Sequence, residues 1–213
     1  MSVTNDSKEE QQQQQPIVAA WDVGTTDLVL CLLQLHGFCD NGLPRFSVLH
    51  WQLYSLDGKT FAAKCESLCK LMHSLRDVLT RARHHVIELQ FRNPTMKALS
   101  HCIQCLTHSE LSHNTPADLN YSVHFMGSET KFKLFKDCGI DFPSDPRAQT
   151  TPARRYRATK TNAVYLAMCL LEDNKLDEQK HWLSQQVARR RDDFADALGL
   201  AATYCVKHIL CYC

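Results

Sequence analysis

The spacing of the hydrophobic residues changes near residue 60, and this change restricts the chain to folds that combine a sheet with helices. Before it, three apolar runs separated by turn residues predict antiparallel strands at 17–22, 28–36 and 46–53. Beyond it, apolar residues recur every three or four positions, which predicts helices at 60–82, 94–109, 129–136 and 160–172, and one or two helices over 178–209. Two further strands are expected at 86–90 and 121–127. This order predicts an α/β fold whose mixed five-stranded sheet, an antiparallel meander followed by parallel strands, is flanked by helices.

The composition favours one intracellular domain. A chain of 213 residues is long enough for one core, expected at 17–213, while the polar low-complexity residues 1–16 are expected to form a disordered tail. No secretory signal begins the chain and no apolar run approaches the ~20 residues of a membrane span, so the 11 cysteines are expected to be reduced. A net charge of +1 argues against a uniformly basic protein, so any nucleic-acid surface must be local.

Several carboxylates stand at positions where an unpaired charge is costly. Asp22 ends a buried strand before a glycine turn, and Glu88 interrupts the apolar run VIELQ. Asp192, Asp193 and Asp196 lie in the helical segment RRRDDFADAL, where spacings of three and four place Asp196 on one face with either of the others. If the first and fourth strands are neighbours, these acids form an all-oxygen cluster of the kind that binds Mg²⁺ or Mn²⁺. The alternative is that the strand-end aspartate stabilises a turn and the Asp-Asp pair caps a helix.

The three segments that carry these acids resemble those of the RuvC-like Holliday junction resolvases. The likeness is greatest to the resolvases of large cytoplasmic DNA viruses, such as poxviruses and iridoviruses, and to those of fungal mitochondria. The matching segments are AAWDVGTTDLVL, VIELQ with Gln90, and RRDDFADAL. The resemblance implies a ribonuclease-H-like fold, a homodimer and cleavage of four-way DNA junctions by paired nicks. It also implies two Mg²⁺ ions per site, for which Mn²⁺ can substitute. It implies that metal ligation and catalysis fall to Asp22, Glu88, Asp196 and at least one of Asp192 and Asp193.

The resemblance also implies a catalytic-side lysine after the fifth strand and a second basic position further on. The segment SETKFKLF offers Lys131 and Lys133, of which Lys133 is favoured by position, and Lys160 fits the second. A viral protein acting in the host cytoplasm or nucleus follows from the same likeness, with no small-molecule substrate. One departure is Thr26-Asp27, where viral relatives often carry a basic residue.

A basic segment precedes the candidate catalytic helix. Arg147, Arg154, Arg155, Arg157 and Lys160 fall in a stretch without acids, and Arg190 and Arg191 directly precede the aspartates. Such residues, with Lys131, suit phosphate contacts, which position DNA without reading its sequence. The alternative is a solvated arginine-rich connector.

Two groups of cysteine and histidine contain the residue types that bind zinc. They are His101, Cys102, Cys105 and His108 on one predicted helix, and Cys205, His208, Cys211 and Cys213 at the C-terminus. Neither has the paired spacing of a zinc module, so buried thiols on apolar helix faces are the preferred interpretation.

Three other functions fit parts of the sequence. DVGTT resembles the phosphate-binding turn of actin-like and sugar-kinase ATPases, although 213 residues with 7 glycines leave no room for their second domain and second phosphate loop. A non-catalytic scaffold would not need the full set of acids. A ribonuclease-H-type nuclease acting on RNA–DNA hybrids would share both fold and acids, and the sequence separates it poorly from a resolvase.

Overall fold

A computed structural model of the chain describes residues 15–89, 93–114, 120–127 and 130–210. Five strands form one mixed sheet in the order β3-β2-β1-β4-β5. The strands are β1 (Ile17–Val23), β2 (Asp27–Phe38), β3 (Pro44–Ser55), β4 (His84–Glu88) and β5 (Ser122–Met126). The pairs β1–β2 and β2–β3 are antiparallel, whereas β1–β4 and β4–β5 are parallel. The predicted α/β fold, with a meander followed by parallel strands, is confirmed.

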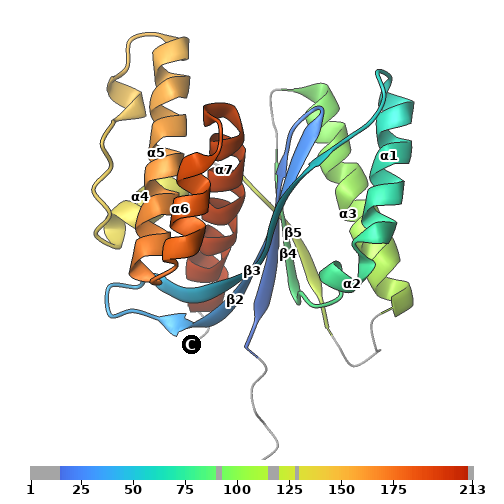
Figure 1. The fold of residues 1–213 in the computed structure, drawn as a ribbon, viewed down its shortest axis with the longest axis horizontal. Coiled ribbons are helices and arrows are strands. Elements are labelled where there is room, and N and C mark those ends of the chain that lie inside the picture. The colour runs from blue at the N-terminus through green and yellow to red at the C-terminus, as the bar shows by residue number, and fades with distance from the viewer. Residues whose placement is uncertain (1–14, 90–92, 115–119, 128–129, 211–213) are drawn as a thin grey trace, which may run out of the picture.

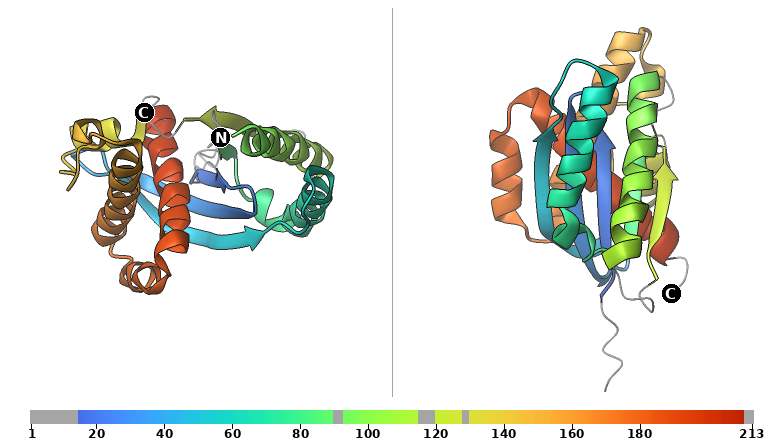
Figure 2. Two further views of the ribbon diagram at one scale, coloured as in Figure 1. Left: turned by 90° about the horizontal axis from the view of Figure 1, so that it is seen from above. Right: turned by 90° about the vertical axis from the view of Figure 1, so that its right-hand side faces the viewer.

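Helices cover both faces of this sheet (Figure 1). One face carries α1 (Phe61–Ser74), α2 (Arg76–Leu79) and α3 (Pro94–Asn114). The other carries α4 (Thr130–Asp137), α5 (Pro152–Asp173), α6 (Asp177–Gln185) and α7 (Ala188–Tyr204). The view from above in Figure 2 shows the sheet between these two helical layers.

The alternation of side chains along β1 assigns its residues to two separate cores. Val18 and Ala20 pack in the core beneath α5 and α7, while Ala19 and Trp21 pack in the core beneath α1 and α3. All four are fully buried, which explains why β1 reads as an uninterrupted apolar run. Since successive side chains of a strand point to opposite faces, Asp22 belongs to the α7 side.

Several helix boundaries differ from the sequence prediction; α3, for example, ends at Asn114 and not near residue 109. The segment predicted as one helix over 60–82 is divided at Leu75 into α1 and α2, and the C-terminal segment is divided into α6, α7 and a π-helical turn, η2 (Cys205–Ile209). The helix predicted to begin at 160 begins at Pro152, because the Thr151 side chain accepts a hydrogen bond from Arg154 N and proline suits a first helical turn. The basic residues 154–157 therefore lie on a helix, after a short 3₁₀ turn, η1 (Pro146–Ala148), rather than in a connector.

The predicted polar tail falls mostly outside the described residues. Its last two positions contact β2: Leu35 N donates to Pro16 O at 2.9 Å, and Gln15 Oε1 lies 2.7 Å from His36 Nδ1. Among the described helices, none is long and apolar enough to cross a membrane.

Candidate active site

The acids of β1 and β4 lie side by side at the carboxyl ends of these strands. Trp21 is in register with Ile87 on the parallel neighbour, so the next residues, Asp22 and Glu88, are adjacent. Glu88 shares its face with Val86, which packs in the same core as Ala20. Both carboxyl groups therefore point toward α7. The juxtaposition expected from strand pairing is present.

The two carboxyl groups are buried next to each other. Burial raises the pKa of Asp22 well above its usual value, and Glu88 raises it further through its charge and through a hydrogen bond between the two carboxyl groups. Only 9% of the Glu88 surface is exposed, so water screens the pair weakly. Two buried carboxyl groups this close together form a place where a metal cation would be stabilised.

Two lysines hold Asp196 of α7 opposite this pair. Lys131 of α4 donates to Oδ1 of Asp196, and Lys160 of α5 donates to Oδ2 at 2.7 Å. Lys131 is 3% exposed and Asp196 is 9% exposed. Burial raises the pKa of Asp196, but the charges of Lys131 and Lys160 outweigh it, so the net pKa is lowered and the carboxylate is ionised.

Lys160 connects the acids of α7 with the acid of β1. Its Nζ lies 3.9 Å from Asp193 Oδ1 in addition to its contact with Asp196. Burial lowers the pKa of Lys160, but Asp196 and then Asp22 raise it by a larger amount, so the side chain stays charged. Lys131 and Lys160 thus supply two positive charges beside Asp196.

The aspartates at the start of the DDFAD motif remain at the margin of the site. Asp192 and Asp193 are both half-buried. Burial raises the pKa of Asp192, while Lys160 opposes this shift. Asp193 makes the ion-pair contact with Lys160, and its neighbour Phe194 is fixed by Trp51, whose Nε1 donates to Phe194 O at 3.1 Å. Trp51 lies on β3, and the sequence carries no signal for this contact.

The lysine that contacts the acids differs from the one favoured by sequence. Lys131 is buried against Asp196, whereas Lys133 is exposed on α4. Residues two apart on a helix are separated by about 200° around its axis, so the two cannot share a face. Phe135, four residues after Lys131, is fully buried and fixes which face of α4 turns inward.

The predicted phosphate-binding residues divide into two groups. Arg154, Arg155 and Arg157 are exposed on the first turns of α5, and Arg190 is exposed at the start of α7. Arg191 is half-buried and donates from Nη2 to Gln186 O at 2.9 Å, so it supports the turn between α6 and α7. The Arg191 guanidinium is therefore engaged within the protein, and its predicted phosphate contact stays a prediction.

The donor set of this site suits a hard divalent cation, because its ligands are carboxylate oxygens. In the part of the chain that the structure describes, no group of three or more His, Cys, Asp or Glu side chains is arranged to hold a metal ion. Both oxygens of Asp196 contact lysine ammonium groups. The cysteine–histidine groups form no such arrangement either within the described residues, and Cys211 and Cys213 lie outside them.

No family model matches this sequence, and no curated protein matches it. Solved structures with a similar fold include three that align over most of the chain. Thermus thermophilus RuvC in complex with Holliday junction substrate is 14% identical, covers 91% of this chain and 96% of its own, and has a TM-score of 0.57. A second structure of Thermus thermophilus RuvC has a TM-score of 0.56 at the same identity and coverage. The yeast mitochondrial Holliday junction resolvase Ydc2 is 12% identical, covers 92% of this chain and 84% of its own, and has a TM-score of 0.55. The chain therefore has the fold of the RuvC-type Holliday junction resolvases.

Proposed function

We propose that this protein is a Mg²⁺-dependent, structure-selective endonuclease that resolves four-way DNA junctions by paired nicks. The observation that carries the proposal is the meeting of Asp22, Glu88 and Asp196 from β1, β4 and α7 in this fold. One solved structure of the same fold, Thermus thermophilus RuvC, is bound to a Holliday junction substrate.

The residues that would hold Mg²⁺ are Asp22, Glu88 and Asp196, with Asp192 or Asp193 at the margin. The raised pKa of Asp22 beside Glu88 supports this assignment, because it reflects negative charge that burial makes costly. When bound, divalent ions would lower the pKa of an attacking water and stabilise the leaving oxygen of the phosphodiester.

The side chains around the acids have separate tasks in this proposal. Lys131 and Lys160 keep Asp196 ionised and oriented, and Lys160 can exchange part of that contact for a phosphate oxygen as DNA enters. Arg154, Arg155 and Arg157 on α5 contact neighbouring phosphates, which orients the strand without reading its bases. A four-way junction is distinguished by shape, so this backbone recognition suffices.

The test compares a labelled synthetic four-way junction, a linear duplex and an RNA–DNA hybrid, each with Mg²⁺ or with EDTA. We expect symmetric nicks in the junction alone, lost in EDTA and lowered by at least ~100-fold in Asp196→Asn. Asp137→Asn is the matched control, because it makes the same charge change at an exposed position of α4 and should keep full activity. Cleavage of the hybrid instead would change the substrate, and no cleavage by a folded protein would refute the nuclease proposal.

The homodimer and the viral source that the sequence resemblance implies belong to this proposal as predictions. Paired nicks require two sites, so sedimentation at the concentration used for cleavage should give twice the mass of the chain. A monomer that still cuts both strands symmetrically would contradict the dimer.

A further inference from the structure

Four cysteines gather where α1 and α3 lie next to each other. Both helices cover the same face of the sheet, as the side view in Figure 2 shows. Cys65 and Cys69 lie one turn apart on α1, and Cys102 and Cys105 lie one turn apart on α3. The Sγ atoms of Cys65 and Cys102 are 4.0 Å apart. Cys69 and Cys105 are exposed, while Cys65 and Cys102 are partly buried.

We propose that Cys65 and Cys102 form a reversible disulfide that cross-links α1 to α3 within one chain. A disulfide holds its sulfur atoms about 2.05 Å apart, so the two must approach by about 2 Å, which is within reach of side-chain rotation with a small helix adjustment. Neither thiol takes part in the carboxylate site, which lies on the opposite face of the sheet.

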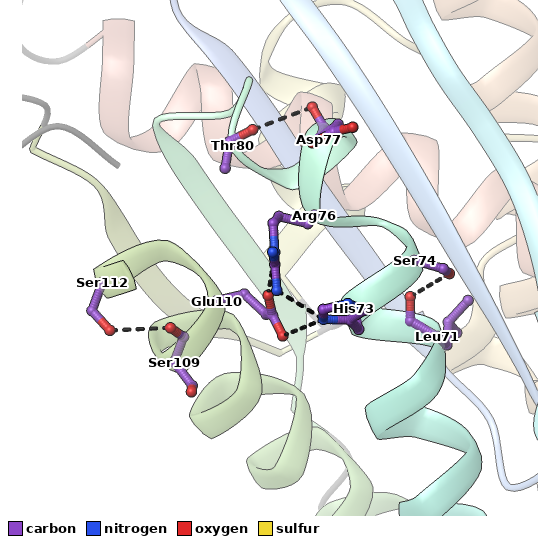
Figure 3. A network of polar contacts seen from close by, with 9 residues as sticks. All are labelled: Leu71, His73, Ser74, Arg76, Asp77, Thr80, Ser109, Glu110 and Ser112. Carbon is purple, nitrogen blue, oxygen red and sulfur yellow. Dashed lines mark hydrogen bonds and ion pairs between the residues drawn. The ribbon is translucent and has the colours of Figure 1, made fainter. Parts of the chain in front are cut away.

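A network of polar side chains links α3 to the end of α1 and the start of α2 (Figure 3). Arg76 Nε donates to Glu110 Oε2 of α3 at 2.8 Å, and Arg76 Nη2 lies 2.8 Å from His73 Nδ1. His73 Nδ1 is also 3.7 Å from Glu110 Oε1. These contacts limit sliding of α1 along α3, so the thiols remain opposite each other in the reduced protein.

The two helices also contact the backbone beside the catalytic acids. Lys64, adjacent to Cys65, donates to Thr25 O in the turn that follows Asp22. Ser100, two residues before Cys102, donates to Glu88 O at 3.1 Å. A covalent link between α1 and α3 would therefore join the two helices that support the ends of β1 and β4.

The oxidant is a small disulfide such as oxidised glutathione. The Cys65 thiolate attacks one of its sulfurs, which forms a mixed disulfide and releases one glutathione thiolate. Cys102 then loses its proton and attacks the Cys65 sulfur, which releases the second thiolate. Two protein thiols thus lose two electrons and two protons, and one disulfide is reduced. Burial, followed by the neighbouring Cys65, raises the pKa of Cys102 to about 11, so Cys102 is protonated at neutral pH and its step accelerates as the pH rises.

The experiment oxidises the full chain with glutathione buffers and analyses it without reduction. Wild type is compared with Cys65→Ser and Cys102→Ser, and with the control variants Cys69→Ser and Cys105→Ser at the exposed neighbours. We expect a bond between the peptides from α1 and α3, and a rise in Tm that dithiothreitol reverses. Because the tryptic peptide 65–70 contains both cysteines of α1, the variants assign the bond: it should vanish in the first pair and persist in the second.

Several results would overturn the proposal. They are a bond that persists in Cys65→Ser or Cys102→Ser, a bond between two chains on a non-reducing gel, or glutathione adducts without any bond between α1 and α3. Mass mapping and Tm need no DNA cleavage, so they separate this inference from the proposed nuclease function.

Discussion

Replacing Lys131 by methionine tests whether the buried ion pair organises the site. The change removes one ammonium from Asp196 and keeps a side chain of similar length. Removing one partner of a buried pair typically costs about 3–5 kcal/mol. Lys160 still contacts Asp196 at 2.7 Å, so the lower end applies, at about 3 kcal/mol. For a chain of this size, that corresponds to a fall in Tm of about 6–12 °C.

The assay is thermal and urea denaturation at pH 7 in EDTA, with Lys133→Met as the matched control. Lys133 is exposed on the same helix, so its replacement should change the free energy of unfolding by less than about 0.5 kcal/mol. Adding Mg²⁺ should then raise the Tm of Lys131→Met more than that of wild type, because one oxygen of Asp196 no longer contacts an ammonium. Equal stability of the two variants would refute the assignment of Lys131 to the site.

Two further predictions concern pH and salt. Since the pKa of Asp22 is raised in the folded state, ionising this group destabilises the fold as the pH rises. Asp22→Asn should therefore unfold at a higher temperature than wild type at pH 7–8 in EDTA, and the difference should shrink as the pH falls toward the ordinary value of 3.8. A constant difference in a Tm–pH series would contradict the raised pKa of Asp22. For junction DNA, fluorescence anisotropy gives the slope of the log binding constant against the log salt concentration. Arg154→Ala and Arg157→Ala should each lower the size of this slope by about 0.9. Arg191→Ala should instead mainly lower Tm, because Arg191 contacts Gln186 O. Unchanged slopes in the first two variants would remove α5 from the DNA surface.

The part of the site that lies on strands could be predicted from the sequence. An acid at the end of an apolar run is conspicuous, and the pairing of β1 with β4 places Asp22 beside Glu88 without further information. The start of α5 is marked by a local signal of the same kind. Thr151 followed by Pro152 marks the start of α5, which places Arg154 on a helix.

The part of the site that depends on how helices pack could not be predicted. The choice between Lys131 and Lys133 is decided by which face of α4 turns inward, and only the burial of Phe135 settles it. Likewise, Arg191 contacts Gln186 O because the chain turns between α6 and α7. The Sγ atoms of Cys65 and Cys102 lie 4.0 Å apart although the residues are 37 positions apart in the sequence, so no local sequence pattern predicts this contact.

The alternation of side chains along β1 also limits how this chain can change in length. Inserting or deleting one residue between Ile17 and Asp22 would turn Asp22 toward α1 and α3 and bring Trp21 to the side of α7. One event would therefore remove a proposed metal ligand and disrupt both cores. The same holds for β4 before Glu88. The turn between β2 and β3 lies at the other end of the sheet, where an added residue shifts neither acid. Length variation compatible with activity should therefore be concentrated there, and alignments of distant sequences should be anchored on β1 and β4.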